Sequence, residues 1–244
     1  MIKISLLGST GRMGQSILSL ITSDKEVVCT GAYCRSSSPL LHKIAYQDST
    51  IKTTFSDQLE EVLQDSDVCI DFSLQESLTD HLECMLKTNI PYVVGVTGLN
   101  SEQHALLHKA SERISVFYDQ NMSLGMNKFK NLIEQTAKNF SPETRVTIHD
   151  VHHANKLDAP SGTAIAISEL LSHYQNNIEI TSDRTGDVIG THTVTFHDEK
   201  EDLIFTHNAK SRDVFALGAI EAAKWITTKG SGFFKMRDLI LDKA

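Results

Sequence analysis

The feature that most constrains the fold is a short apolar run followed at once by a glycine-rich loop, at residues 2–14. The run reads IKISLL, and Gly8-Ser9-Thr10-Gly11-Arg12-Met13-Gly14 follow it. Apolar residues then recur at Ile17, Leu18 and Ile21, which is helical spacing. A strand, a glycine loop and a helix in this order are typical of the phosphate-binding turn of a dinucleotide fold. Because these glycines depart from the commoner GxGxxG spacing, a glycine-rich turn without a ligand is the alternative.

The next hundred residues alternate between apolar runs and helical patterns. They predict strands at 27–33, 68–72, 92–96 and 115–118, and helices at 57–63, 75–87 and 101–113. Such alternation indicates parallel βαβ units, whose ligands bind beyond the carboxyl ends of the strands. Four of these ends carry glycine or polar residues, at 8–14, 71–73, 95–97 and 119–122. Together they favour a cofactor cleft.

The pattern changes after residue 122. Residues 123–140 predict one long amphipathic helix, whose apolar stripe indicates core packing, and 145–151 predict a strand. A helix at 161–173 is followed by polar residues and by strands at 192–197 and 203–208, and a last helix is expected at 212–228. We therefore predict an α/β fold with two domains. Residues 1–122, completed by 212–244, form a Rossmann-type parallel sheet, and residues 123–211 form a smaller α+β domain with a mixed sheet for substrate binding and oligomerisation.

Charge and composition exclude several classes of function. The net charge of −8 argues against a nucleic-acid binder or a membrane-surface binder, and no apolar run approaches the roughly 18 residues of a membrane span. Met1 leads directly into a strand pattern, so we expect no signal peptide and a cytoplasmic location. The four cysteines form no CxxC pair and are expected to be reduced core thiols.

The most informative segment for chemistry is HHANKLDAPSGTA, residues 152–164. Its proline sets the backbone at the threshold of a helix, whose first turn is expected to leave unpaired the amides of Ser161, Gly162 and Thr163. Such an end attracts anions, and a carboxylate would fit it. Lys156 adds a positive charge, while His152 and His153 can exchange protons near neutral pH. The segment predicts a pocket for a small anionic substrate with an acid/base group inside it.

Plainer interpretations of the same residues exist. Two adjacent histidines could begin a zinc site, but zinc needs a third and usually a fourth ligand, and the other histidines show no ligand spacing. We therefore expect no metal. Asp158 is expected to order its loop rather than to bind substrate. The remaining histidines are expected to be surface or structural residues: His42, His81, His104, His108, His173, His192, His197 and His207.

The chain resembles the dihydrodipicolinate (4-hydroxy-tetrahydrodipicolinate) reductase family of bacterial lysine biosynthesis. The resemblance runs nearly end to end, and the block at 152–164 is highly specific for the family. The chain is somewhat short for it, with trimmed loops near residues 38–50 and 174–182. The other motifs that carry the resemblance are GSTGRMG at 8–14, IDFS at 70–73, VGVTG at 94–98, NMSLGMN at 121–127, GDVIGTHTV at 186–194 and AKSRDVFALGAIEAAKW at 209–225.

The resemblance implies an NAD(P)H-dependent reduction. Family members transfer a hydride from a reduced nicotinamide cofactor to a cyclic, unsaturated dicarboxylate and release the 4-hydroxyl group as water. His152 and Lys156 match the proton donors of the family. The substrate contacts are expected at His153, Lys156, Ser161, Gly162 and Thr163. The family also implies a homotetramer that assembles through the sheet of the smaller domain. The implied cofactor residues are Gly8, Ser9, Thr10, Gly11, Arg12, Met13, Gly95, Val96, Thr97, Asp119, Gln120, Asn121 and Met122.

The choice of cofactor is predicted from the end of the second strand. An NAD-preferring fold places Asp or Glu about 20 residues beyond the glycine loop, and this chain has no acidic residue between Val27 and Gln47. Cys34-Arg35-Ser36-Ser37-Ser38 stands there instead, and Arg35 could pair with a 2′-phosphate. We predict a preference for NADPH over NADH. The alternative is that Arg35 is a solvated loop residue and both cofactors serve.

Two other function classes stay open. A semialdehyde dehydrogenase could use the same first domain, but it needs an activated cysteine, and all four cysteines lie in strand-like or helical stretches before residue 85. A non-catalytic cofactor sensor would have no use for His152 and Lys156 beside an anion site.

Overall fold

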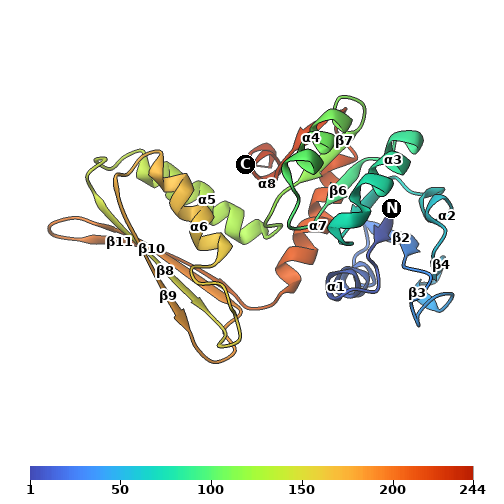
Figure 1. Ribbon diagram of the computed structural model, residues 1–244, viewed down its shortest axis with the longest axis horizontal. Coiled ribbons are helices and arrows are strands. Elements are labelled where there is room, and N and C mark those ends of the chain that lie inside the picture. Colours follow the sequence, from blue (N-terminus) through green and yellow to red (C-terminus); the bar gives the residue numbers. More distant parts are fainter. Residues whose placement is uncertain (244) are drawn as a thin grey trace. The chain divides into compact units, whose positions relative to one another are not determined.

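The computed structural model describes residues 1–243, which form two compact units (Figure 1). Unit 1 comprises Met1–Leu124 and the described residues from Phe215 onward, and unit 2 comprises Gly125–Val214.

Unit 1 is built on an eight-stranded sheet with the order β12-β7-β6-β5-β1-β2-β4-β3. The paired strands are parallel except for β3, which runs antiparallel to β4 at one edge. The chain passes from β1 to β2 on one side and reaches β5 on the other, so the strand order reverses at β1, where such sheets bind ligands. The predicted Rossmann-type sheet is confirmed. The strands are β1 (Ile2–Leu7), β2 (Val27–Tyr33), β3 (Ile44–Gln47), β4 (Lys52–Ser56), β5 (Val68–Asp71), β6 (Tyr92–Val94), β7 (Ser115–Tyr118) and β12 (Gly232–Phe234).

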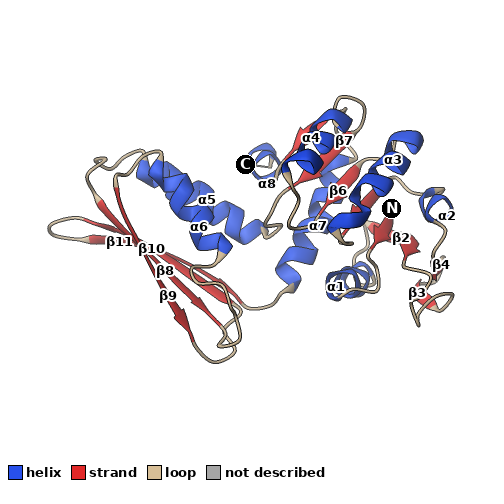
Figure 2. Cartoon of the chain, in the orientation of Figure 1, coloured by secondary structure: helices blue, strands red, loops and turns tan. Residues whose placement is uncertain are grey.

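Helices cover both faces of this sheet because successive side chains of a strand point to opposite sides. Leu6 packs in one buried core with α1, α7 and α8, while Leu7 packs in a second core with α2, α3 and α4. Figure 2 shows these helices around the strands. Their bounds are α1 (Arg12–Ile21), α2 (Leu59–Leu63), α3 (Leu78–Thr88, preceded by a 3₁₀ turn at Gln75–Ser77), α4 (Ser101–Ala110), α7 (Asp213–Ile226) and α8 (Met236–Asp242).

The glycine loop fits this sheet only because its glycines lack side chains. Gly8 has a left-handed backbone with a φ of 70°, and a Cβ there would lie 2.5 Å from the carbonyl oxygen of Phe72. A Cβ on Gly14 would lie 2.4 Å from the carbonyl oxygen of Gly8. These contacts let α1 begin directly against the end of β1.

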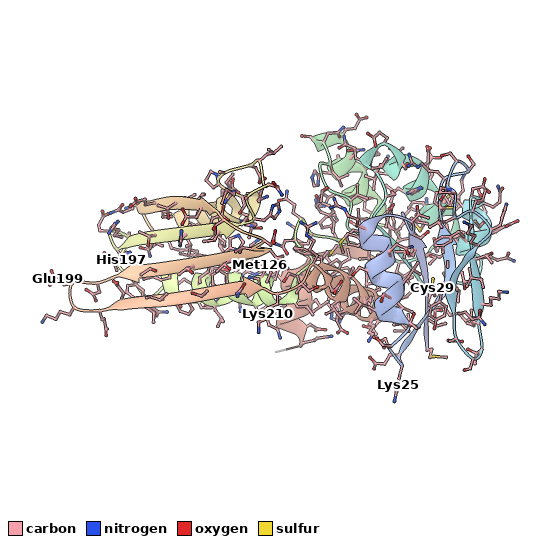
Figure 3. All side chains as sticks on the ribbon, turned by 90° about the horizontal axis from the view of Figure 1, so that it is seen from below. Lys25, Cys29, Met126, His197, Glu199 and Lys210 are labelled. Carbon is pink, nitrogen blue, oxygen red and sulfur yellow. The ribbon has the colours of Figure 1, made fainter. Side chains whose placement is uncertain are left out.

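Unit 2 is a four-stranded mixed sheet with the order β11-β10-β8-β9, and α5 and α6 lie on one face of it (Figure 1). β8 (Arg145–His152) is parallel to β9 (Asn177–Arg184) and antiparallel to β10 (Gly190–His197), which pairs in turn with β11 (Asp202–Ala209). Glu199 marks the hairpin between β10 and β11 in Figure 3. Residues of α5 (Leu124–Ala137) and α6 (Gly162–Ser172) form one core with the inward residues of β8 and β10. The predicted mixed sheet is confirmed.

Several elements differ from the sequence-based expectation. The polar link expected after residue 173 contains the strand β9. This strand was not predicted because its sequence, NIEITSDR, alternates in burial but consists mostly of polar residues. The short strands β3, β4 and β12 and the helix α8 were not predicted either. The strand expected over 92–96 ends at Val94, and the helices expected over 101–113 and 123–140 are each shorter.

Two compositional expectations are tested by the described residues. All four cysteines are free and buried, as expected of reduced core thiols. Within residues 1–243, no helix is both long and apolar enough to span a membrane.

The close approach at Gly14 generates a stability prediction. Gly14→Ala should lower the free energy of unfolding by roughly 1–3 kcal/mol, because the new methyl group meets backbone atoms that cannot yield. Gly230→Ala is the matched control, since a Cβ there would meet nothing within 4 Å. Urea unfolding followed by circular dichroism measures both. Equal midpoints for the two variants would contradict this account of the loop.

Candidate functional site

A pocket of about 180 Å³ lies at the carboxyl ends of β1 and β2 in unit 1. Four of the predicted cofactor residues help to form it, and none of its lining residues is acidic. The lining residues come from the glycine loop, the ends of β2 and β5, and the region of α3: Gly8, Thr10, Gly11, Tyr33, Cys34, Arg35, Phe72, Ser73, Leu74, Ser77 and His81.

The loop that forms one wall of this pocket is tied to β2. Ser9 is fully buried, and both its amide and its hydroxyl donate to the carbonyl oxygen of Tyr33, at 3.2 and 2.6 Å. Gln15 Nε2 donates to the carbonyl oxygen of Ser9. The N-cap of α1 is Gly11, which offers no side-chain cap, so the start of this helix has the features of an anion site. The exposed Arg12 and the half-buried Met13 begin that helix.

Arg35 lies on an exposed turn directly after β2 and lines the pocket. The amide of Ser38 donates to the carbonyl oxygen of Arg35, which closes the turn. Ser36 and Ser37 are exposed beside it.

The predicted cofactor residues after β6 and β7 belong to neighbouring strand ends and do not line this pocket. Gly95 packs against the ring of Phe72, Val96 is buried in a core, and Thr97 is exposed. The residues after β7 are placed as follows: Gln120 is exposed, Asn121 is half-buried, Met122 is buried against α7, and Asp119 accepts a hydrogen bond from the amide of Met236 at the start of α8.

A buried ionisable group lies beneath the pocket. Asp71 is fully buried and accepts hydrogen bonds from His81 Nδ1 at 2.8 Å, from the amide of Ser73 and from the hydroxyl of Tyr92. Burial alone would raise the pKa of Asp71, but the hydrogen bond and charge of His81 outweigh it and lower that pKa. Burial and the Asp71 charge raise the pKa of Tyr92 well above its usual value. His81 is thus a structural residue, as expected.

In unit 2 the predicted substrate residues surround a second buried carboxylate, Asp150 of β8. Asp150 is fully buried. Its two oxygens accept the amide and the hydroxyl of Ser161, at 2.9 and 2.8 Å. Arg184 of β9 lies 3.2 Å from Oδ2 through one guanidinium nitrogen. Burial would raise the pKa of Asp150, but the hydrogen bonds of Ser161 and the nearby histidines hold it below its ordinary value.

Two histidine rings meet the same carboxylate. His152 Nδ1 lies 2.9 Å from Asp150 Oδ1, a close electrostatic contact whose angle is poor for a hydrogen bond. His192 Nε2 lies 3.3 Å from the same oxygen, and the two rings are 5.3 Å apart between centroids. Burial lowers the pKa of His152, while the charge of Asp150 opposes the shift. Burial also lowers the pKa of His192, to about 4.

The loop after β8 carries the other predicted substrate residues. Lys156 Nζ donates to Asp158 Oδ1 at 2.7 Å, and this hydrogen bond lowers the pKa of Asp158. The guanidinium of Arg184 donates to the carbonyl oxygen of Asp158, so β9 also holds this loop. The backbone of His153 accepts the amide of Lys156, and its side chain is half-buried. Asp158 therefore orders the loop, as expected, but through its side chain as well as its backbone.

The start of α6 differs from the expectation in one respect. The amide of Ser161 is not unpaired, because it donates to Asp150, and the Ser161 hydroxyl caps the helix by accepting from the amide of Ala164 at 3.2 Å. A Cβ placed on Gly162 would meet nothing within 4 Å, so this turn opens onto free space. Thr163 follows Gly162 in the first turn and is half-buried. The helix start can still receive an anion, with Ser161 as part of its support.

Sequence reasoning missed Asp150, His192 and Arg184. The expectation that His192 is merely surface or structural did not foresee its contact with Asp150. Asp150, His152 and His192 bring possible ligand atoms within 4.8 Å of one another, the geometry of a candidate metal cluster. The oxygens of Asp150 already accept from Ser161 and face a guanidinium, which disfavours a second cation. The alternation of HDVHH along β8, with Asp150 and His152 on the inward face, was the available signal.

Two family models together match nearly the whole chain. The model described as "Dihydrodipicolinate reductase, N-terminus" matches residues 2–122, and "Dihydrodipicolinate reductase, C-terminus" matches 125–240. The 4-hydroxy-tetrahydrodipicolinate reductase of Pseudoalteromonas translucida (strain TAC 125) is 37% identical, over 98% of this chain and 97% of that protein. The enzyme of the same name from Burkholderia multivorans is 32% identical, over 98% of each.

Solved structures show the same fold. A dipicolinate-bound dihydrodipicolinate reductase from Paenisporosarcina sp. TG-14 gives a TM-score of 0.81 at 19% identity, covering 96% of this chain and 97% of that chain. An aspartate semialdehyde dehydrogenase with NADP from Candida albicans gives 0.52 at 12% identity, covering 82% and 72%. A semialdehyde dehydrogenase needs an activated cysteine thiol. The four cysteines of this chain are buried, and burial raises the pKa of Cys34, the cysteine that lines the pocket, so none of these thiols is activated in that way. With both halves matched and relatives above 30% identity along its length, the chain belongs to the dihydrodipicolinate reductase family.

Proposed function

We propose that this chain is an oxidoreductase that reduces 4-hydroxy-tetrahydrodipicolinate to tetrahydrodipicolinate with loss of water, in lysine biosynthesis through diaminopimelate. Family membership over nearly the whole chain supports the assignment. One observation on the structure carries it: a histidine held by a buried carboxylate stands beside a helix start that can receive an anion. This combination suits a small acidic substrate that must be protonated as it is reduced.

We expect the cofactor to bind with its phosphates at the pocket of unit 1. The backbone of the glycine loop can approach phosphates at Gly11, which has no side chain, while Gly8 and Gly14 allow the tight turn and the close packing of α1, and Arg35 offers a cation at the pocket wall. The proposed cofactor residues are those of the glycine loop, Arg35, and the loops at 95–97 and 119–122. The bound nicotinamide cofactor supplies the hydride.

The substrate residues of unit 2 bind the carboxylates and move a proton. The helix start at Ser161, Gly162 and Thr163 receives one carboxylate, because the helix dipole favours negative charge there, while the amide of Ser161 is already held by Asp150. His153 and Lys156 contribute further contacts. Hydride addition leaves negative charge on the conjugated substrate, and a proton held on His152 Nε2 or Lys156 Nζ neutralises it, an effect typically worth about 10²–10⁴-fold in rate.

Lys156 is already positioned in a charged pair. Its contact with Asp158 keeps the ammonium ion near the helix start, and the substrate carboxylate can replace Asp158 as the partner because the Asp158 side chain is exposed. The Asp158 carboxylate thereby occupies the position beside Lys156 that we expect the substrate carboxylate to take.

The function is tested by incubating the purified protein with enzymatically generated substrate and NADPH. Substrate-dependent loss of the reduced-nicotinamide absorbance is expected. Cofactor binding without turnover would favour a sensor instead. Reduction of NADP⁺ in the presence of aspartate semialdehyde and phosphate would favour a semialdehyde dehydrogenase. Either result would overturn the proposal.

The proton donors generate a catalytic prediction. His152→Ala and Lys156→Ala should each lower kcat by about 10²-fold or more and leave the Kd for NADPH nearly unchanged, because both residues lie in unit 2. Thr163→Val should mainly raise the KM for the substrate, since it removes a hydroxyl contact and no acid. Steady-state kinetics and cofactor titration separate these effects. Near-normal turnover of either alanine variant would remove that residue from the mechanism.

The pocket without acidic residues generates a specificity prediction. We expect a lower KM for NADPH than for NADH, because Arg35 can pair with the 2′-phosphate and no carboxylate lines the pocket to bind the ribose. Arg35→Glu should shift kcat/KM towards NADH. Lys25→Glu is the control, since it makes the same charge change at an exposed residue outside the pocket (Figure 3). Equal kcat/KM for both cofactors in the unmodified protein would contradict the prediction.

The sheet face opposite α5 and α6 generates an assembly prediction. Its residues alternate with the buried ones and include Thr193 and Thr206, paired at the centre, and the exposed Ile204. Proteins usually cover such a face, so we propose a homotetramer that forms through it. Light scattering should give about four times the monomer mass of 27.1 kDa. A monomer at micromolar concentration would refute the proposal.

A further inference from the structure

We propose that Asp150 is a positioning residue that fixes the ring of His152 and the start of α6 as one unit, with the ring of His192 as a second neighbour of the same carboxylate. The inference rests on the proposed function, because it concerns how the proton donor and the anion site of that reaction are held together.

The first step is the sharing of one carboxylate. Asp150 Oδ1 lies 2.9 Å from His152 Nδ1, 3.3 Å from His192 Nε2 and 2.8 Å from Ser161 Oγ. Oδ2 accepts the amide of Ser161, which is the N-cap of α6. A displacement of this side chain would therefore move the histidine and the helix start together.

The second step concerns which nitrogen of His152 carries a proton. The negative charge of Asp150 Oδ1, 2.9 Å from Nδ1, favours a proton on Nδ1 over a bare lone pair there, even though the contact is electrostatic and not a well-aligned hydrogen bond. The other nitrogen, Nε2, lies over Gly190, where a Cβ would be only 3.0 Å away. The glycine leaves room at Nε2, the nitrogen that remains to exchange a proton with the substrate. Asp150 thus selects the tautomer and leaves the reactive nitrogen free.

The third step concerns His192. Its residue is buried, and burial lowers its pKa to about 4, so it is neutral at neutral pH. Its Nε2 lies 3.3 Å from Ser161 Oγ, and because that hydroxyl already donates to Asp150, the neutral ring donates to the hydroxyl without adding a second positive charge beside the carboxylate. The negative charge of Asp150 therefore stays available to stabilise the imidazolium of His152.

The charged and titratable groups around His152 shift its pKa in opposite directions. The charge of Asp150 raises the pKa of His152, whereas burial, Lys156 and Arg184 lower it. His207 and Lys130 act on His192 rather than on His152. Asp150 is the carboxylate that raises the pKa of His152. Removing this carboxylate should therefore lower the pKa of His152, and protonated His152 should be lost at a lower pH.

The experiment compares Asp150→Asn with Glu134→Gln. Glu134 is a second buried carboxylate of unit 2, whose Oε1 accepts from Tyr174 and pairs with Lys138, so the control makes the same chemical change away from the histidines. Asp150→Asn should lower kcat by about 10²-fold or more. It should also shift the alkaline limb of the kcat/KM profile to lower pH by roughly one unit. Glu134→Gln should leave the position of that limb unchanged, and Asp150→Glu should restore much of the rate.

A second readout needs no substrate. Long-range ¹H–¹⁵N NMR of histidine-labelled protein should show His152 protonated at Nδ1 in the unmodified protein, with that preference lost in Asp150→Asn, and the His152 signal assigned from His152→Gln. An Nδ1-protonated ring that persists in Asp150→Asn, or an unshifted pH profile, would overturn the positioning role. The tautomer can be measured even if the protein proves to reduce nothing, so failure of the proposed function and failure of this inference are separate results.

Discussion

The site of unit 2 depends on the burial of one charged side chain, Asp150, at the inner end of β8. A buried carboxylate is costly unless it is hydrogen-bonded and its charge is balanced. Here the balance comes from every neighbouring element: Ser161 at the start of α6, Arg184 on β9, His192 on β10 and His152 on β8 itself. The elements are thereby held in a fixed arrangement by a group that touches no solvent. Removing the charge would weaken the hold on all of these partners at once.

The pocket of unit 1 depends on the absence of side chains in its glycine loop. A bound phosphate would require the loop backbone close by and an uncapped start of α1. Both are present because Gly8, Gly11 and Gly14 carry no side chain. The buried carboxylate of Asp71 nearby accepts hydrogen bonds from His81 and Tyr92, so its charge does not act as a ribose acceptor in the pocket. Arg35 is left as the charged side chain at the pocket wall.

The sequence was sufficient for the parts that depend on strong local patterns. The apolar run before Gly8 and the alternation that follows predicted the parallel sheet, and the block at 152–164 predicted the family. The strand β9 was not predicted because most of its residues are polar, whereas a strand is recognised in sequence by the periodicity of apolar residues. Asp150, His192 and Arg184 escaped because their meeting depends on the register of three strands, which pairs residues far apart in the sequence. The paired amide of Ser161 has the same origin, since its partner lies eleven residues earlier on β8.

The central claim is that the proton donor and the anion site form one electrostatic unit. Its most direct test is a titration with dipicolinate, a dicarboxylate bound in one solved structure of this fold, that measures the proton uptake on binding. Calorimetric titration near neutral pH, in buffers of different ionisation enthalpy, measures this uptake. Burial lowers the pKa of His152, and an anion bound beside it raises that pKa again, so the account predicts net uptake that disappears in His152→Gln. A binding enthalpy independent of the buffer, or the same uptake in His152→Gln, would contradict it.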